Sequence, residues 1–330
     1  MGSRTQPRIC VVTCMKNEGP FVLEWIAHNL AVGVSDFLIF TNDCDDGTDA
    51  ILDNLDARGI VRHLPTPTMA LKNDQHHRTT LAYAPFHKEF RRSDYVMIID
   101  TDEFFFSTVG DGSIPALLAA LEQPDVISLS ELNFGFGGVL AFEDALVTTQ
   151  FKKAGSLAPE GRLRRGVKSI MKVQDRIRDY SNHRPAVHPE TVDGLRWLDG
   201  SGNPVTREFM LEGDRGFDVR GRYDLARINH YTLRSGESML AKFERGDAVR
   251  AARMNMNYFR KRNDHEAVID DFAPRLGALQ ERLETLRRDK PLRRLHETAV
   301  AAHRTKIAAL KEDPAFAEVW ASIREVVATT

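Results

Sequence analysis

Apolar runs alternate with amphipathic stretches along the first hundred residues. Short runs rich in β-branched residues predict strands at 8–13, 36–41, 60–64 and 96–100, and a further strand at 126–132. Helical spacing predicts helices at 18–31, 48–57 and 73–90, the last kinked at Pro85 because proline lacks an N–H. Strands that alternate with helices favour a largely parallel sheet covered by helices on both faces.

The pattern changes twice after residue 133. Residues 155–166 are typical of a loop rich in glycine and basic side chains, and 184–221 of loops with short strands. From Glu237 the composition shifts to Ala, Leu, Arg and Glu with helical spacing, and an apolar stripe follows at Leu276, Leu279, Leu283 and Leu286. We therefore expect a domain at 8–235 and a C-terminal helical extension at 236–330 packed on it.

Composition narrows the class of protein. The chain has 330 residues, 42% of them hydrophobic and 28% charged, with a net charge of −2. A sizeable core is available, and the near-neutral charge gives no case for nucleic acid as a partner. The three cysteines lack disulfide or zinc spacing, which favours a reducing compartment. No apolar run has the length of a membrane span, so we expect a cytoplasmic location, with peripheral membrane contact as the alternative.

The most informative motif is Asp100-Thr101-Asp102, directly after the apolar run at 95–99. Two carboxylates spaced i, i+2 at a strand end enter the crevice where ligands of open α/β sheets bind. Oxygen ligands without thiols suit Mg²⁺ or Mn²⁺, which such sites share with substrate phosphates. The alternative is a solvated turn, because aspartate is common in turns.

Two other predicted strands end in polar clusters. The first ends in Thr13, Lys16, Asn17 and Glu18, where a helix N-terminus and the lysine favour an anion. The second ends in Asn42, Asp43, Asp45 and Asp46, whose side chains can hydrogen-bond a base or a ribose. The alternative for the second cluster is a turn at Asp46-Gly47 followed by a helix cap at Thr48.

A third cluster follows the run at 225–228. His230 is a candidate metal ligand beside Asp100 and Asp102, and nitrogen ligation favours Mn²⁺ over Mg²⁺. Tyr231, Arg234 and Ser235 can donate hydrogen bonds to phosphate. The alternative is a structural, hydrogen-bonded histidine. Lys242 and Arg245 lie on the helix that follows.

These motifs, in this order, resemble the family-2-like glycosyltransferases of the GT-A fold, and most of all a bacterial subgroup with an Asp-x-Asp-Glu-Phe motif. The matching segments cover roughly residues 8 to 250: 13–18, 24–28, 42–48, 100–104, Phe134-Gly135, Lys168-Ser169-Ile170 and 229–235. The resemblance implies a single Rossmann-type α/β sheet, mixed but mostly parallel and flanked by helices.

The resemblance also implies a function. A nucleotide diphosphate sugar, with UDP preferred, would donate its sugar to a glycan or lipid-linked acceptor. The nucleoside would lie on Thr13, Asn17, Glu18 and the turn from Asn42 to Asp45. Asp102 would be the better metal ligand, with Asp100 nearer the ribose. Mn²⁺ or Mg²⁺ would stabilise the leaving diphosphate.

An inverting enzyme of this kind needs a carboxylate base for the acceptor hydroxyl. Related enzymes carry it in a Glu-Asp pair well after the metal motif, and here the pair at Glu143-Asp144 comes early. Glu131, at a strand end, is the preferred candidate, with Asp193 and then Asp199 at the more usual separation.

Three alternatives stay open at the sequence level. A nucleotidyltransferase also uses paired carboxylates, but its usual glycine-rich first loop is missing from 13–18. A non-catalytic nucleotide-sugar-binding protein would not need both Asp100 and Asp102. The basic stretch from Arg162 to Lys172, which holds no acid, is either a solvated loop or a site for an anionic acceptor.

Overall fold

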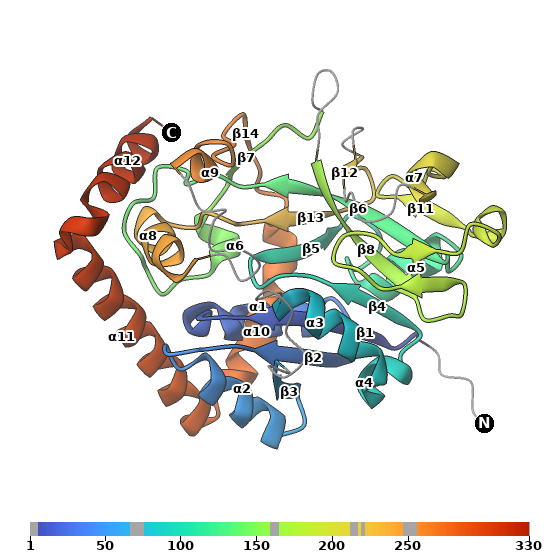
Figure 1. Cartoon of the computed structure of the whole chain (residues 1–330), viewed down its shortest axis with the longest axis horizontal. Helices are drawn as coiled ribbons and strands as arrows, with labels where there is room; N and C mark the ends of the chain where they lie inside the picture. The colour runs from blue at the N-terminus through green and yellow to red at the C-terminus, as the bar shows by residue number, and fades with distance from the viewer. Residues whose placement is uncertain are drawn as a thin grey trace.

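The computed structural model describes residues 6–66, 76–158, 165–211, 217–218, 222–246 and 256–329. Its centre is a ten-stranded sheet in the order β3-β2-β1-β4-β8-β6-β13-β5, with β11 beside β6 and β12 beside β8 (Figure 1). The strands are β1 Ile9–Met15, β2 Asp36–Thr41, β3 Arg62–Pro65, β4 Tyr95–Ile98, β5 Glu103–Ser107, β6 Val126–Asn133, β8 Arg165–Lys172, β11 Trp197–Asp199, β12 Phe217–Asp218 and β13 Ala226–His230. Only β5 and β8 run against the other strands, so the sheet is mixed and mostly parallel, as expected.

Two short antiparallel pairs of strands lie outside this sheet. They join β7 (Lys153–Ala154) to β14 (Ala267–Val268) and β9 (Ile177–Asp179) to β10 (Ala186–Val187). The α-helices are α1 Gly19–Ala31, α2 Thr48–Ala57, α3 His76–Tyr83, α4 Lys88–Arg91, α5 Ile114–Ala120, α6 Val147–Gln150, α7 Arg207–Leu211, α8 Gly236–Arg245, α9 Met256–Arg260, α10 Leu276–Arg287, α11 Lys290–Glu312 and α12 Ala317–Ala328.

Separate hydrophobic cores lie on the two faces of the sheet. On one face, residues of α1, α5 and α10 such as Trp25, Leu117 and Leu283 pack on the strands. On the other, Leu81 of α3 and Phe90 of α4 join a cluster around Trp197. Covering both faces buries the continuous apolar runs of the central strands, which is the physical reason for their composition. The α/β class with flanking helices is confirmed.

The predicted elements agree with the structure in most places. The predicted strands match β1, β2, β3, β4 and β6 to within two residues at either end, and α1 and α2 match almost as well. The helix expected at 73–90 is broken: α3 ends at Tyr83, a 3₁₀ turn holds Pro85, and α4 follows. Residues 73–75 lie outside the described part.

Two strands of the central sheet were not predicted, β5 and β8. The reading of 155–166 as a loop fails at its end, because Arg165 already begins β8; residues 159–164 lie outside the described part. This strand pairs antiparallel with both β4 and β6. The interpretation of the basic stretch as a solvated loop is therefore wrong for its described residues, 165–172, because Lys168 is in the core of the sheet.

The C-terminal helices pack on the sheet domain. Helices α10 and α11 contact α1, and α11 also contacts α2 and α8; Figure 1 shows α11 and α12 along one side of the molecule beside α8. The stripe residues Leu279, Leu283 and Leu286 are buried, as a packed helix requires. A Cβ on Gly19 would lie 2.7 Å from that of Ala299, so α11 approaches the start of α1 closely. The domain boundary at residue 235 stays a prediction.

Among the described residues, no helix combines the length and the apolar character that crossing a bilayer requires. The parallel direction of β1, β2, β4, β6 and β13 brings their carboxyl ends to one edge of the sheet. The polar clusters that follow these strands in sequence therefore meet in space.

Candidate active site at the carboxyl ends of the strands

The Asp100-Thr101-Asp102 turn joins β4 to β5 and is fixed by hydrogen bonds. The Trp25 Nε1 group donates to the carbonyl oxygens of Asp100 at 3.1 Å and Glu103 at 3.2 Å. The Asp100 N–H donates to Glu103 Oε2 at 2.9 Å. The turn is thus held by the Glu103 carboxylate and by the buried Trp25 of α1, so the two aspartates leave the sheet in a defined geometry.

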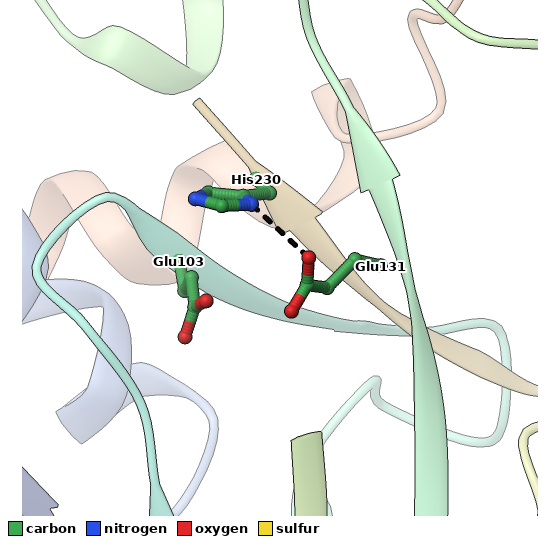
Figure 2. A group of neighbouring side chains, drawn as sticks. All are labelled: Glu103, Glu131 and His230. Atoms are coloured by element: carbon green, nitrogen blue, oxygen red, sulfur yellow. Dashed lines mark hydrogen bonds and ion pairs between the residues drawn. The ribbon is translucent and has the colours of Figure 1, made fainter. Parts of the chain in front are cut away.

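His230, the last residue of β13, stands between two carboxylates. Its Nε2 lies 3.6 Å from Asp102 Oδ1, and its Nδ1 lies 3.3 Å from Glu131 Oε2. Figure 2 shows the imidazole beside Glu131 of β6, with Glu103 of β5 on the neighbouring strand. His230 pairs directly with Glu103 across the antiparallel ladder. Three strands therefore bring these side chains together.

Two lysines neutralise the acids of the site. Lys168 Nζ, from β8, lies 3.0 Å from Asp100 Oδ2, 3.0 Å from Glu103 Oε2 and 2.7 Å from Asn182 Oδ1. Lys242 Nζ, from α8, lies 2.6 Å from Asp102 Oδ2 and 2.9 Å from the Thr232 carbonyl oxygen. Buried charges need partners of this kind.

The two groups that face each other at the outer end of the site are both held charged. Burial would raise the pKa of Asp102, but the positive charges of Lys242 and His230 lower it well below its usual value. Burial would lower the pKa of His230, but Asp102 and Glu131 raise it well above its usual value. The pair is therefore an ion pair in this protein, with strong preference for a cation beside Asp102.

The pKa values of the other two acids of the cluster, Glu103 and Glu131, are shifted in opposite directions. Burial raises the pKa of Glu103 to about 8, against the lowering effect of Lys168. Burial also acts to raise the pKa of Glu131, but the hydrogen bond to His230 and the charge of that ring lower it to about 2. Glu131 is thus the carboxylate to which the Nδ1–H of His230 donates.

A divalent ion fits the outer end of this cluster. Without an ion the ring is protonated, so a divalent ion would have to displace the Nε2 proton of His230. Asp102 Oδ1 and the freed Nε2 would then offer one oxygen and one nitrogen ligand, a donor set that suits Mn²⁺. The neighbouring Asp100 side chain is 39% exposed, so substrate phosphates can approach the motif from its side, whereas Asp102 and His230 are nearly buried. Glu103, Glu131 and His230 also lie close enough to hold an ion, but the buried ammonium of Lys168 already supplies the positive charge on that side.

Glu18 and Arg234, both expected on the donor, form a buried clamp. Glu18 accepts from Arg234 at 2.7 Å and from Arg245 at 2.6 Å, and all three side chains are buried. Arg245 also donates to the Asn17 carbonyl oxygen, and Arg234 to that of Thr101. The clamp ties the loop after β1 to the metal-motif turn and to α8, so its residues position the site.

The loops after β1 and β2 are joined by reciprocal hydrogen bonds. The Asn17 amide donates to Asp45 Oδ1 at 2.7 Å and accepts from the Asp45 N–H at 2.9 Å. Asp43 is exposed and 4.0 Å from Lys16, and Asn42 is buried beside Cys14. The turn at Asp46-Gly47, offered as the alternative, is present, with Asp46 Oδ1 accepting from the Thr48 N–H. The cap expected at Thr48 is wrong, because Gly47 is the N-cap and Thr48 already begins α2.

Thr13 is buried in β1, and its Oγ1 has no hydrogen-bond partner among the described residues. An orphan hydroxyl at this depth is a notable feature of a binding site, because buried polar groups normally find partners. It lies on the strand whose end carries Asn17 and Glu18. Contact between any of these residues and a nucleoside stays a prediction.

The structure does not bring Asp193 to the cluster. Asp193 is on the surface in an ion pair with Arg207, just before β11, which runs beside the first half of β6 rather than its end. Asp199 and Asp144 are also apart from it: Asp199 caps a turn at Ser201, and Asp144 pairs with His296. Of the candidate bases, only Glu131 is in the site.

Sequence reasoning missed Lys168 and Glu103 as members of the site. Lys168 lies in the basic stretch interpreted as a solvated loop or an acceptor site, although the apolar Val167, Ile170 and Met171 around it are a signal of burial. A lone lysine among apolar residues is usually paired. Glu103 directly follows Asp102, and no local pattern marks it as part of the site.

The sequence matches one family of known proteins over more than half of the chain. The model of glycosyltransferase family 92 matches residues 8–192. A family 92 protein of Ricinus communis is 24% identical over 291 residues, which cover 84% of this chain and 43% of that protein. One from Oryza sativa subsp. japonica is 35% identical over 58 residues, 17% of this chain and 10% of the other. The chain thus spans less than half the length of these relatives.

Solved glycosyltransferase structures match weakly. The structure of Staphylococcus aureus TarS 1–349 in complex with UDP has a TM-score of 0.34 at 10% identity, covering 92% of this chain and 91% of that one. The mannosyltransferase Ktr4p of Saccharomyces cerevisiae has a TM-score of 0.26 at 10% identity, covering 41% and 42%. Scores this low carry no argument about the site. The sequence resemblance to family 2 is corrected in its family number, because the matching model is that of family 92.

Proposed function

The chain belongs to glycosyltransferase family 92, and from this premise we propose that it is a metal-dependent transferase. It moves a sugar from a nucleotide diphosphate sugar to a hydroxyl group of a glycan or lipid-linked acceptor. The observation that carries the proposal is the pairing of Asp102 with the imidazole of His230 in a buried charge cluster, next to the partly exposed Asp100.

Asp102 and His230 would hold Mn²⁺ or Mg²⁺ through Oδ1 and Nε2. When bound, the ion would neutralise the charge that develops on the leaving diphosphate. Asp100, fixed by Lys168, stands at the mouth of the site, where it can accept from a ribose hydroxyl. Each acid of the motif thus has a separate task, set by its own lysine.

Glu131 supports this arrangement from the opposite side of the ring. Its carboxylate accepts from Nδ1 of His230, which leaves Nε2 facing Asp102. Metal-binding histidines commonly rely on such a carboxylate to set the tautomer and the ring orientation. We assign Glu131 this positioning role. Its expected role as general base, and with it the inverting outcome, stay predictions.

The donor is proposed to be a UDP-sugar, on the resemblance that the sequence motifs carry. The nucleoside would contact polar groups at the ends of β1 and β2, namely Thr13, Asn17 and the Asn42–Asp45 turn. The three cysteines are free, which suits a reducing compartment, so we place the activity in the cytoplasm, with peripheral membrane contact if the acceptor is lipid-linked.

A thermal-shift screen tests this function. UDP, GDP, ADP and CDP would be added with and without Mn²⁺, since a ligand that binds only the native state raises its melting temperature. We expect UDP with Mn²⁺ to stabilise more than either alone, and the protein to hydrolyse UDP-sugars slowly when Mn²⁺ is present. Stabilisation without donor turnover would favour a non-catalytic binding protein. Turnover of a nucleoside triphosphate would favour a nucleotidyltransferase.

A further inference from the structure

A small cavity lies beside β5, the last strand in the order of the central sheet. Its volume is about 70 Å³, and its walls come from the second half of α1, from β5, from the loop before α5, and from α10 with the 3₁₀ turn Ala273–Arg275 that precedes it. Helices α1 and α10 contact each other and overlap in Figure 1. The cavity thus lies between the sheet domain and the C-terminal extension.

This cavity is separate from the candidate active site. None of the residues assigned to that site lines it. Strand β5 begins at Glu103, which belongs to the charge cluster, and ends at Ser107, which lines the cavity. The four steps between these residues span about 13 Å along a strand. A ligand in the cavity would therefore leave the donor site free.

The buried part of the lining is apolar and aromatic. Phe105, Phe106, Phe272 and Leu279 line the cavity, and all four side chains are buried. The last three form a hydrophobic cluster of their own. An engineered cavity of roughly 150 Å³ with similar walls holds benzene. About half that volume suits an apolar body of about three carbon atoms.

His28 adds a polar atom to this buried lining. Its side chain is buried, and its Nε2 has no hydrogen-bond partner among the residues that the structure describes. Burial lowers the pKa of His28 to about 4, so the ring is neutral and places no charge beside an apolar ligand. Because buried polar groups normally find partners, the orphan nitrogen indicates that a water molecule or a ligand completes this wall.

Arg275 places a cation at the mouth of the cavity. Its Nη2 donates to the Ser107 carbonyl oxygen at 3.2 Å. A Cβ on Gly112 would lie 2.6 Å from its Nε, so the guanidinium is held against that glycine. Within the described ranges, Arg275 forms no ion pair with a carboxylate. Its remaining N–H groups are therefore available, and their planar fork matches the geometry of a carboxylate.

Asp111 is an acid on the same rim. Its side chain is exposed, and its Oδ1 accepts from the Ser113 N–H at 3.0 Å. Hydrogen bonds from Ser113 lower the pKa of Asp111, so its charge opposes an anion. Water and salt screen an exposed charge of this kind, whereas paired N–H···O bonds from an arginine are strong. A carboxylate thus gains more from Arg275 than it loses to Asp111.

We propose that this cavity binds a short-chain carboxylate, with its body of about three carbons among the phenylalanines and its carboxylate group on Arg275. A small organic acid fits better than a sugar, because most of the buried lining offers no hydrogen bonds to hydroxyl groups. The ligand would join the extension to the sheet domain, since its body contacts β5 and its charge contacts the residue before α10. This binding does not rest on the proposed transferase function.

Ligand-observed NMR titrations of the full chain test the chemistry of the ligand. The probes are butyrate, its neutral analogue butyramide and its cationic analogue butylamine, each with and without UDP and Mn²⁺. We expect butyrate to bind, butyramide to bind about fivefold more weakly or worse, and butylamine not to bind. UDP with Mn²⁺ should leave the affinity for butyrate unchanged, because the two sites are separate.

Substitutions test the place of binding. Arg275→Gln should weaken butyrate binding about fivefold or more, and Arg282→Gln, at an exposed position of α10, should leave it unchanged. Asp111→Asn keeps an oxygen for the Ser113 N–H but removes the charge, so binding should tighten about twofold. Ala278→Trp, on the rim, should block the cavity, which keeps the test decisive if Arg275→Gln does not fold.

Several results would overturn the inference. They are no binding of butyrate to the wild type, equal binding of butyramide or butylamine, displacement of butyrate by UDP with Mn²⁺, weaker binding to Asp111→Asn, or wild-type affinity in Ala278→Trp. Equal losses in Arg275→Gln and Arg282→Gln would overturn it as well. A melting temperature close to that of the wild type shows that a variant is folded. Failure of the proposed function would be seen separately, as a loss of stabilisation by UDP with Mn²⁺.

Discussion

The Nζ of Lys242 lies 2.6 Å from Oδ2 of Asp102, although 140 positions separate the two residues in the chain. The contact joins α8 to the metal-motif turn. It occupies one carboxylate oxygen of Asp102 and leaves the other, Oδ1, facing His230 Nε2. A fixed ammonium beside a metal ligand keeps the empty site neutral and adds a positive charge near the place where a diphosphate would lie.

Replacing Lys242 by methionine should separate these effects. Without the ammonium, no positive charge beside Asp102 repels the ion, so we expect bare Mn²⁺ to bind about tenfold more tightly. UDP should bind about tenfold more weakly to the same variant, because the Lys242 ammonium near the expected place of the diphosphate is lost. Isothermal titration with each ligand alone measures both changes. A fall in both affinities would show that Lys242 only holds the fold of the site.

The role of Glu131 can be tested with two substitutions. Glu131→Gln keeps an oxygen that accepts from His230 Nδ1, so the affinity for Mn²⁺ in the presence of UDP should stay within about threefold. Glu131→Ala removes that acceptor and should lower the affinity about 10- to 100-fold. Equal losses in the two variants would contradict the positioning role. If Glu131 is also the base, Glu131→Gln will lose kcat while its Mn²⁺ affinity is kept.

Lys168 should matter more for stability than any surface lysine. Lys168→Met leaves Asp100 and Glu103 without their shared buried cation, and breaking a buried pair in this way costs about 3–5 kcal/mol. Lys172→Met, in the same strand but only partly buried, should change the free energy of unfolding by less than about 0.5 kcal/mol. Urea unfolding of both variants provides the comparison. Similar small effects would show that the inner acids are held by other groups.

His28 should make stability depend on pH. Its ring is buried against Phe104 and Phe272, and burial lowers its pKa to about 4 from the ordinary 6.5. Because the folded pKa is lower than the unfolded one, the stabilising contribution is full above pH 6.5 and is lost as the pH falls towards 4. The difference in unfolding free energy between wild type and His28→Leu should fall by up to about 3 kcal/mol across that window. A difference that is flat with pH would exclude this.

Much of the sheet domain was predictable because local patterns determine it. The runs at 36–41 and 48–57 predict β2 and α2 correctly, since each pattern has one period and clear end signals. Residues 103–107 hold three consecutive phenylalanines, but their pattern does not predict a strand. Their role depends on pairing with β13, more than a hundred residues later, and no local pattern carries that information.

The site divides in the same way. Strand-end position pointed to Asp100, Asp102 and His230 together, and the structure places them at one edge. Partners decide the rest: Glu18 and Arg234 satisfy each other in a clamp, and Lys168 reaches the acids from a strand that the sequence pattern did not reveal. The local sequence around a charged residue does not show which distant residue will be its partner.

The central claim is that Asp102 and His230 together hold the divalent ion. Electron paramagnetic resonance of Mn²⁺, titrated in the presence of UDP, tests it without relying on turnover. Asp102→Asn and His230→Gln should each weaken Mn²⁺ binding by about tenfold or more, and Asp193→Asn, the surface control, should leave it unchanged. Wild-type Mn²⁺ affinity in both Asp102→Asn and His230→Gln would contradict the claim and place the ion, if any, elsewhere.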